Sequence, residues 1–312
     1  MNPAPVFHAI AELAGVPGPI FLAIGVFDGV HLGHRAVIER ALADAARENG
    51  RAIVVTFDPH PSRVLRPDKA PRLLTATRHK LQLIRALGVD HLLVLPFTRE
   101  FAATPPRKFV TELFGACHRL REICVGHEWS FGHDRAGNLQ MLAQLGDELG
   151  FDEVGVPAVR IDGKVVSSTL IRAAIEAGDF ETARRFLGRD YTVLGTVVRG
   201  DGLGRQLGFP TANLSAHNEQ FPPDGVYVVE AKLGTSELPG VVNIGVRPTI
   251  AGATGNRTLE LHLLDFTEDI YGEDVEISFS RFLRPEHKFD GLAELKAQLA
   301  QDVAAARSSA QH

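Results

Sequence analysis

The sequence predicts an α/β + β fold: an N-terminal domain with a parallel sheet, then an antiparallel β domain with a terminal helix. Three observations support this prediction. Strand and helix patterns alternate through the first half, the pattern changes to strands after about Gly188, and a length of 312 residues suits two domains rather than one. Either a barrel or a sandwich would fit the strands of the second half.

In the first half, buried strands alternate with amphipathic helices. Apolar runs predict the strands, and apolar residues at helical spacing predict the helices. The expected strands are Phe21–Phe27, Arg51–Phe57, His91–Phe97 and Glu122–Val125, and the expected helices follow His34 up to Gly50 and cover Lys80–Leu87, Pro106–Phe114 and Asn138–Leu149. This alternation implies a parallel sheet with helices on both faces, which binds ligands at the carboxyl ends of its strands.

In the second half, β-type runs follow one another with Gly, Pro and Asp between them, as in an antiparallel β domain. The runs are YTVLGTVV, GVYVVEAKL, GVVNIGV, TLELHLLDF and DVEISFSRFL, all between Tyr191 and Leu283. A last helix is expected over Gly291–Ala306. The linker between the two halves is expected near Gly178–Asp190.

Composition excludes several classes of protein. A net charge of −5 and a pI near 6.2 argue against a nucleic-acid partner. Two cysteines supply no disulfide framework, which favours a reducing cytosol and a cytoplasmic location. The N-terminal residues lack the charged and apolar regions of a signal peptide. No run reaches the roughly 18 apolar residues of a membrane span, so we expect no membrane partner.

The stretch Phe21–Gly50 carries the strongest functional signal. An apolar strand turns through Asp28-Gly29 into a helix, and His31 and His34 lie at the turn with Gly33 between them. A glycine-containing turn before a helix lets backbone N–H groups approach a phosphate, and both imidazoles would face the same group. HxGH alone is also typical of an ordinary turn, or of half a zinc site, although no CxxC pair accompanies it.

Three later stretches of the first half follow strands or open helices. TFDPHP holds His60 between two prolines, and VGHEWSFG brings Glu128 and Trp129 into a glycine-punctuated loop suited to a nucleotide or flavin ring. For Trp129 the pattern slightly favours a packing residue over a stacking platform. In SSTLIR, Ser168 and Thr169 open a helix with Arg172 one turn on, which suits pyrophosphate but is also common helix capping.

The second half contains a glycine-rich loop and a strand carboxylate. Glycines between Arg199 and Gly208 would let backbone amides surround phosphates, although such a loop is often only a mobile hairpin. Thr211 and Asn213 offer uncharged oxygens of the kind that Mg²⁺ prefers. Glu260 alternates with leucines in TLELH, so its carboxylate lies on the opposite face of that strand, where most carboxylates are solvated.

Taken together, these motifs resemble the bacterial bifunctional riboflavin kinase/FAD synthetase (FMN adenylyltransferase) family over nearly the full chain. GxFDGxHxGH, TFDPHP, VGxDFxFG…G and SSTxIR match its nucleotidyltransferase module, and GRxLGFPTAN and the ExH strand match its flavokinase module. The resemblance implies a Rossmann-like domain over 1–186 and a flavokinase β-barrel over 187–312. Two positions depart from the family pattern. Glu128-Trp129 stands where the family usually has Asp or Asn followed by Phe, and Asn138 stands where Asp is common.

The resemblance also implies roles for individual residues. Catalytic roles fall to His31, His34, Arg172 and Glu260, and the metal of MgATP to Thr211 and Asn213. ATP or phosphate contacts fall to Gly25, Phe27, Asp28, Gly33, Ser168, Thr169, Gly202, Gly204 and Arg205, and flavin contacts to His60, Glu128, Trp129 and Arg284.

The implied function is ATP-dependent conversion of riboflavin to FMN and then of FMN to FAD and pyrophosphate. Mg²⁺ would accompany ATP, and FMN and FAD would be intermediate and product rather than prosthetic groups. ATP, riboflavin and FMN would be the small-molecule partners, and the sequence leaves a homo-oligomer open. The alternatives are another adenylyl- or cytidylyltransferase with an unrelated β domain, or a non-catalytic flavin or nucleotide sensor. A class I aminoacyl-tRNA synthetase also uses HxGH, but no KMSKS-like string is present.

Overall fold

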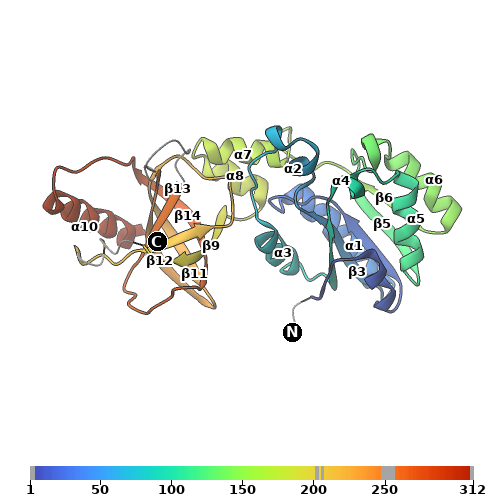
Figure 1. Cartoon of the computed structure of the whole chain (residues 1–312), viewed down its shortest axis with the longest axis horizontal. Helices are drawn as coiled ribbons and strands as arrows, with labels where there is room; N and C mark the ends of the chain where they lie inside the picture. The colour runs from blue at the N-terminus through green and yellow to red at the C-terminus, as the bar shows by residue number, and fades with distance from the viewer. Residues whose placement is uncertain (1–3, 201–203, 205–206, 247–256, 310–312) are drawn as a thin grey trace. The chain divides into compact units, whose positions relative to one another are not determined.

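The computed structural model describes residues 4–200, 204, 207–246 and 257–309. The chain divides into two compact units, Met1–Ser168 and Thr169–His312. Figure 1 shows the helices and strands of both units along the chain. The predicted domain boundary between residues 186 and 187 lies further along the chain than this division and stays a prediction.

The first unit is built on a six-stranded parallel sheet in the order β1-β4-β3-β2-β5-β6, which confirms the predicted parallel sheet. Its edge strands β1 and β6 were absent from the prediction because one is only two residues long and the other is only partly buried. The strands are β1 (Val6–Phe7), β2 (Ile20–Ile24), β3 (Arg51–Asp58), β4 (His91–Pro96), β5 (Leu120–Gly126) and β6 (Asp152–Val156).

Helices cover both faces of this sheet, and a hairpin of β7 (Arg160–Ile161) and β8 (Lys164–Val165) follows it. The α-helices are α1 (Leu32–Arg47), α2 (Pro61–Leu65), α3 (Thr77–Arg85), α4 (Arg99–Ala102), α5 (Pro106–Ala116) and α6 (Leu139–Leu149), and the 3₁₀ helices are η1 (Ile10–Gly15), η2 (Pro67–Lys69) and η3 (His133–Arg135).

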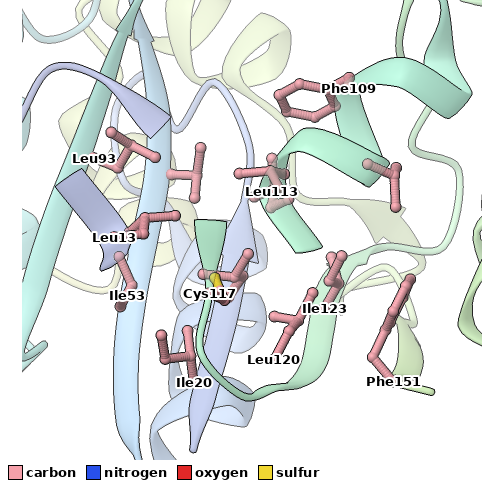
Figure 2. Close-up of a cluster of buried hydrophobic side chains, with 14 of the residues drawn as sticks. Leu13, Ile20, Ile53, Leu93, Phe109, Leu113, Cys117, Leu120, Ile123 and Phe151 are labelled. Carbon is pink, nitrogen blue, oxygen red and sulfur yellow. The ribbon is translucent and has the colours of Figure 1, made fainter. Parts of the chain in front are cut away.

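The central strands are buried on both faces, so alternate side chains enter two different cores. Phe21 and Ala23 of β2 pack in the cluster formed with α1 and α3, whereas Leu22 packs in the cluster formed with η1, α5 and α6. Figure 2 shows part of the second cluster, which contains Phe109 and Leu113 of α5 and strand residues such as Ile123. Burying a large apolar side chain such as Phe21 or Leu22 stabilises the fold by about 1.5–3 kcal/mol.

The sheet reverses its order at β2. From β2 the chain proceeds outward through β3 and β4, then returns to β5 on the other side of β2. The connections that leave the carboxyl ends of β2 and β5 therefore diverge, and open α/β sheets bind their ligands at such a switch point. Residues 25–31 and 127–132 follow these two ends.

The second unit is a closed antiparallel barrel in the order β10-β13-β12-β11-β14-β9, which settles the choice between barrel and sandwich. Strand β10 was not predicted, because the alternation in ANLSA contains one leucine and two small alanines, which is a weak apolar signal. Helix α7 (Ser168–Glu176) begins at the last residue of the first unit. The elements that follow are α8 (Phe180–Leu187), β9 (Thr192–Val198), β10 (Ala212–Ala216), β11 (Gly225–Leu233), β12 (Ser236–Val246), β13 (Arg257–Leu263), β14 (Asp274–Arg284) and α10 (Leu292–Ser309).

Helix α8 fills the segment where the sequence predicted a linker, and it packs on the barrel. Phe180 stacks on Phe279 with ring centroids 5.5 Å apart and meets Tyr227 edge-on at 5.8 Å. Among the described residues no helix is both long and apolar enough to cross a membrane.

A buried acidic pair joins α1 to β5. Glu122 of β5 faces Asp44 of α1, the Cys124 thiol donates to Glu122 Oε1 at 2.8 Å, and Arg40 and Arg47 pair with Asp44. Burial, reinforced by the Asp44 carboxylate, raises the pKa of Glu122 from 4.5 to about 7. The folded chain therefore holds this proton more tightly than the unfolded chain does.

Stability should accordingly fall as the pH rises from about 4.5 through 7, because ionised Glu122 is disfavoured only in the folded state. We expect Glu122→Gln to remove part of this fall, as measured by the unfolding midpoint between about pH 5 and pH 8. Glu39→Gln, which changes an exposed glutamate on α1, is the matched control. A Glu122→Gln profile parallel to that of the unmodified chain would contradict this account.

Candidate active sites

The loop after β2 places His31 and His34 at the start of α1. His31 is the N-cap residue, and its Nδ1 accepts a hydrogen bond from the His34 backbone N–H at 3.2 Å. The two imidazole rings stack with centroids 3.5 Å apart and planes inclined by 18°. Because Nδ1 of His31 is an acceptor, the neutral ring carries its proton on Nε2. The structure thus brings the two histidines of HxGH together as one paired group.

Two of the glycines predicted to lie in the site, Gly25 and Gly33, stand where close packing leaves little room for a larger residue. A Cβ on Gly33 would lie 3.1 Å from Cε1 of His31, and a Cβ on Gly25 would lie 2.8 Å from the Phe27 ring. Phe27 in turn meets His34 edge-on, with centroids 5.4 Å apart. These residues shape the surroundings of the histidine pair, and their contact with ATP stays a prediction.

Asp28 is buried and anchors the same loop. Its carboxylate accepts hydrogen bonds from the backbone N–H groups of Leu74 at 3.2 Å and Thr75 at 3.0 Å. The hydroxyl of Ser168, the first residue of α7, donates to the Asp28 carbonyl oxygen at 2.9 Å. Thr169 and Arg172 continue α7 in the second compact unit. Asp28 therefore has a clear role in holding the loop.

The remaining predicted residues of this unit follow β3 and β5. His60 is the N-cap of α2, and its Nδ1 accepts from the Ser62 N–H at 3.2 Å. After β5, Glu128 is exposed, while Trp129 stacks on Phe131 with centroids 4.3 Å apart and packs against the core. The structure thus supports a packing role for Trp129. Asn138 caps α6 by accepting from the Met141 N–H.

In the barrel, strand register aligns three polar residues. Asn213 of β10 and Asn243 of β12 are the direct partners of Glu260 on β13, so the three side chains leave the same face. Leu259 and Leu261, which flank Glu260, are buried on the other face. The alternation in TLELH correctly separates these faces.

Glu260 lines a cavity in this unit together with Thr211 and Gly204. Gly204 has no room for a Cβ beside the Phe209 carbonyl oxygen and the Thr211 side chain, and Gly200 leaves space for the Asn213 amide. Gly202 and Arg205, which were predicted to bind phosphate, lie outside the described residues. The cavity thus brings Thr211 and Glu260 together, and Asn213 lies beside Glu260 through the strand register.

Arg284 lines the same cavity, and its guanidinium group forms an ion pair with Asp302 of the terminal helix α10. Its Nε and Nη2 donate to the Asp302 carboxylate, with the shortest contact at 2.8 Å, and Asp302 is only 5% exposed. Its Nη1 donates to the Pro285 carbonyl oxygen at 3.2 Å. This ion pair fixes the end of β14 against α10.

The sequence-based prediction missed Asn243 and Glu286 in the cavity wall. The Asn243 amide donates to Glu286 Oε1 at 2.8 Å, and Gly245 leaves the space that Glu286 occupies. NIG in the strand GVVNIG was a signal for Asn243, but nothing local marks Glu286, because its partner lies 43 residues away.

A histidine pair at the switch point of a parallel sheet, followed by a barrel with a carboxylate in a cavity, is typical of a two-domain transferase acting on phosphate groups. The family model for FAD synthetase matches residues 15–170, and that for riboflavin kinase matches residues 187–310. The chain belongs to the bifunctional riboflavin kinase/FMN adenylyltransferase family, and it is therefore an enzyme of flavin cofactor biosynthesis.

Relatives with that name cover most of the chain. The protein of Escherichia coli K12 is 40% identical over 287 residues, which is 92% of this chain and 91% of the relative. That of Bacillus subtilis is 35% identical over 285 residues, covering 90% and 89%. A solved structure titled macrolide-efflux protein from Streptococcus pneumoniae is similar with a TM-score of 0.77 and 27% identity, covering 98% of this chain and 95% of that one.

Proposed function

We propose that each domain carries out one of two successive reactions, with the boundary between residues 186 and 187. The barrel transfers the γ-phosphoryl group of ATP to the 5′-hydroxyl of riboflavin, giving FMN and ADP. The parallel-sheet domain joins the AMP part of a second ATP to FMN, giving FAD and pyrophosphate. The observation that carries the proposal is the pairing of Asn213 and Asn243 with Glu260 beside the barrel cavity.

In the kinase reaction, Glu260 accepts the proton of the riboflavin hydroxyl as that oxygen attacks the γ-phosphorus. Thr211 and Asn213 fit a magnesium ion, because both offer uncharged oxygens close to a carboxylate. When bound, the ion supplies positive charge to the phosphates of ATP. Gly202, Gly204 and Arg205 hold those phosphates, and Gly204 lines the cavity.

In the adenylyl transfer, the FMN phosphate attacks the α-phosphorus of ATP directly, with no covalent enzyme intermediate. His31 and His34 donate hydrogen bonds to the oxygens on which negative charge develops, and Gly25, Phe27, Asp28 and Gly33 form the ATP-binding loop. Ser168, Thr169 and Arg172, all on α7, hold the leaving pyrophosphate.

Flavin contacts are proposed for His60, Glu128 and Trp129 in the first unit and for Arg284 in the barrel. The first three follow strands whose carboxyl ends lie at or beside the switch point, and Arg284 lines the barrel cavity. A cytoplasmic location fits a biosynthetic enzyme whose two cysteines, Cys117 and Cys124, are both free and buried.

The test is chromatography of the products that the full chain forms from riboflavin and ATP, with Mg²⁺ and with excess chelator. We expect FMN first and then FAD with Mg²⁺, pyrophosphate released only in the second step, and neither product when Mg²⁺ is removed. FMN without FAD would contradict the assignment of the first domain. Full product formation in chelator would contradict the metal assignment.

A further inference from the structure

Lys80 is a buried cation beneath the loop that carries the histidine pair. It lies on α3 and is only 5% exposed. Its Nζ donates hydrogen bonds to the Val26 carbonyl oxygen at 3.2 Å, the Thr56 hydroxyl at 3.0 Å and the Phe57 carbonyl oxygen at 3.2 Å. All three acceptors lie at the carboxyl ends of β2 and β3, so one ammonium group serves both strand ends.

These three contacts lie where the two strands separate. The paired register of β2 and β3 ends at Ile24 and Val55, followed by one backbone hydrogen bond, from the Gly25 N–H to the Val55 carbonyl oxygen at 3.1 Å, and by one from the Thr56 hydroxyl to the Val26 carbonyl oxygen at 3.0 Å. Beyond that point the segment after β2 leads to His31 and the segment after β3 leads to His60. An ammonium group has three N–H donors, and Lys80 uses them to join these two segments where the hydrogen bonds of the sheet end.

The loop that Lys80 supports has an unfavourable backbone conformation. Phe27 has a φ of 54° and the β-branched Val30 a φ of 41°, and residues other than glycine rarely adopt such values. A conformation of this kind persists only where its surroundings hold it. The same segment that provides Lys80 also provides the Leu74 and Thr75 N–H groups that bind Asp28. Residues 74–80 thus form the support of the histidine loop.

We propose that Lys80 is a positioning residue for adenylyl transfer, because its charged ammonium holds the Gly25–His34 loop in the conformation that pairs His31 with His34. This inference rests on the proposed function of the first domain. The inference adds that FAD formation depends on Lys80, whereas FMN formation does not. Neither the sequence motifs nor the barrel cavity identifies this residue.

The charge of Lys80 can change within an accessible pH range. Burial lowers the pKa of Lys80 to about 8, and the carboxylates of Asp28 after β2 and Asp58 at the end of β3 partly oppose that effect. A neutral amine has only two N–H donors and cannot serve all three oxygens. Raising the pH through about 8 should therefore release part of the loop support, whereas an ordinary exposed lysine keeps its charge to about pH 10.

The experiment compares Lys80→Met, Lys80→Arg and the control Lys108→Met, an exposed lysine of the same unit, in the full chain. FAD formation from FMN and FMN formation from riboflavin are each measured across about pH 6.5 to 9.5. We expect Lys80→Met to lower kcat for FAD formation by about tenfold or more at neutral pH, with FMN formation and the control unchanged.

The pH profile distinguishes positioning by charge from simple packing. In the unmodified chain FAD formation should fall above about pH 8, and in Lys80→Arg that fall should be absent because arginine stays charged. A Lys80→Met chain with the original rate, or a Lys80→Arg profile that still falls at the same pH, would overturn the inference. If the unmodified chain itself formed no FAD, the proposed function would be overturned as well. The sample of unmodified chain therefore distinguishes failure of the proposed function from failure of the inference about Lys80.

Discussion

Glu260→Gln should reduce FMN formation from riboflavin by about 10²–10⁴-fold, the usual contribution of a general base. Glutamine keeps the size of the side chain and its place between Asn213 and Asn243, but it cannot accept a proton at neutral pH. Conversion of FMN to FAD should remain unchanged, because that reaction is assigned to the other domain. The measurement is the initial rate of each reaction with purified variant.

The matched control is Glu230→Gln, which changes an exposed glutamate on barrel strand β11. It should leave both reactions unchanged. If Glu260→Gln phosphorylated riboflavin within a few-fold of the original rate, Glu260 would not be the base. Loss of both reactions in this variant would contradict the division of the chemistry between the two domains.

His31→Asn should reduce FAD formation from FMN by about 10²–10³-fold, since the shorter side chain lacks the imidazole Nε2–H that donates to the developing charge. Asparagine is a good N-cap, so its side chain can still accept from the His34 N–H at the start of α1. His31→Ala should show the same loss of FAD formation and, in addition, lose about 1 kcal/mol of stability with the cap. FMN formation should be unaffected in both variants.

His118→Asn, which changes an exposed histidine of the same unit, is the control for this pair. The measurements are initial rates of FAD formation and thermal unfolding of each variant. A His31→Asn chain that forms FAD at the original rate would show that His31 only caps α1.

Local pattern predicted the fold class and most elements, because both domains depend on features that a short stretch of sequence shows. Buried apolar runs marked β2 to β5, and strict alternation marked β13, where Leu259 and Leu261 are buried and Glu260 is not. Elements with a weak apolar signal escaped prediction. Strand β10 reads as ANLSA, in which Leu214 is the only large apolar residue, and it pairs with β9 and β13 in the barrel.

For the candidate sites, too, the sequence predicted what local spacing determines and missed what depends on distant contacts. The spacing of HxGH correctly suggested that His31 and His34 lie together, because both sit within one helical turn. Lys80 gave no such signal: it is a lysine in an amphipathic helix, and its partner Val26 lies 54 residues earlier. Contacts of this kind follow from the order of strands in the sheet, which the local pattern does not contain.

The central claim is that one chain holds two separate active sites, and mixing two variants tests it most directly. Glu260→Gln alone should form almost no FMN from riboflavin, and His31→Asn alone should stop at FMN. Incubated together with riboflavin, ATP and Mg²⁺, they should form FAD, because FMN made by one variant is used by the other. Separate assays would first show that Glu260→Gln still converts FMN to FAD and that His31→Asn still converts riboflavin to FMN. If the mixture then formed no more FAD than either variant alone, the existence of two independent active sites would be contradicted.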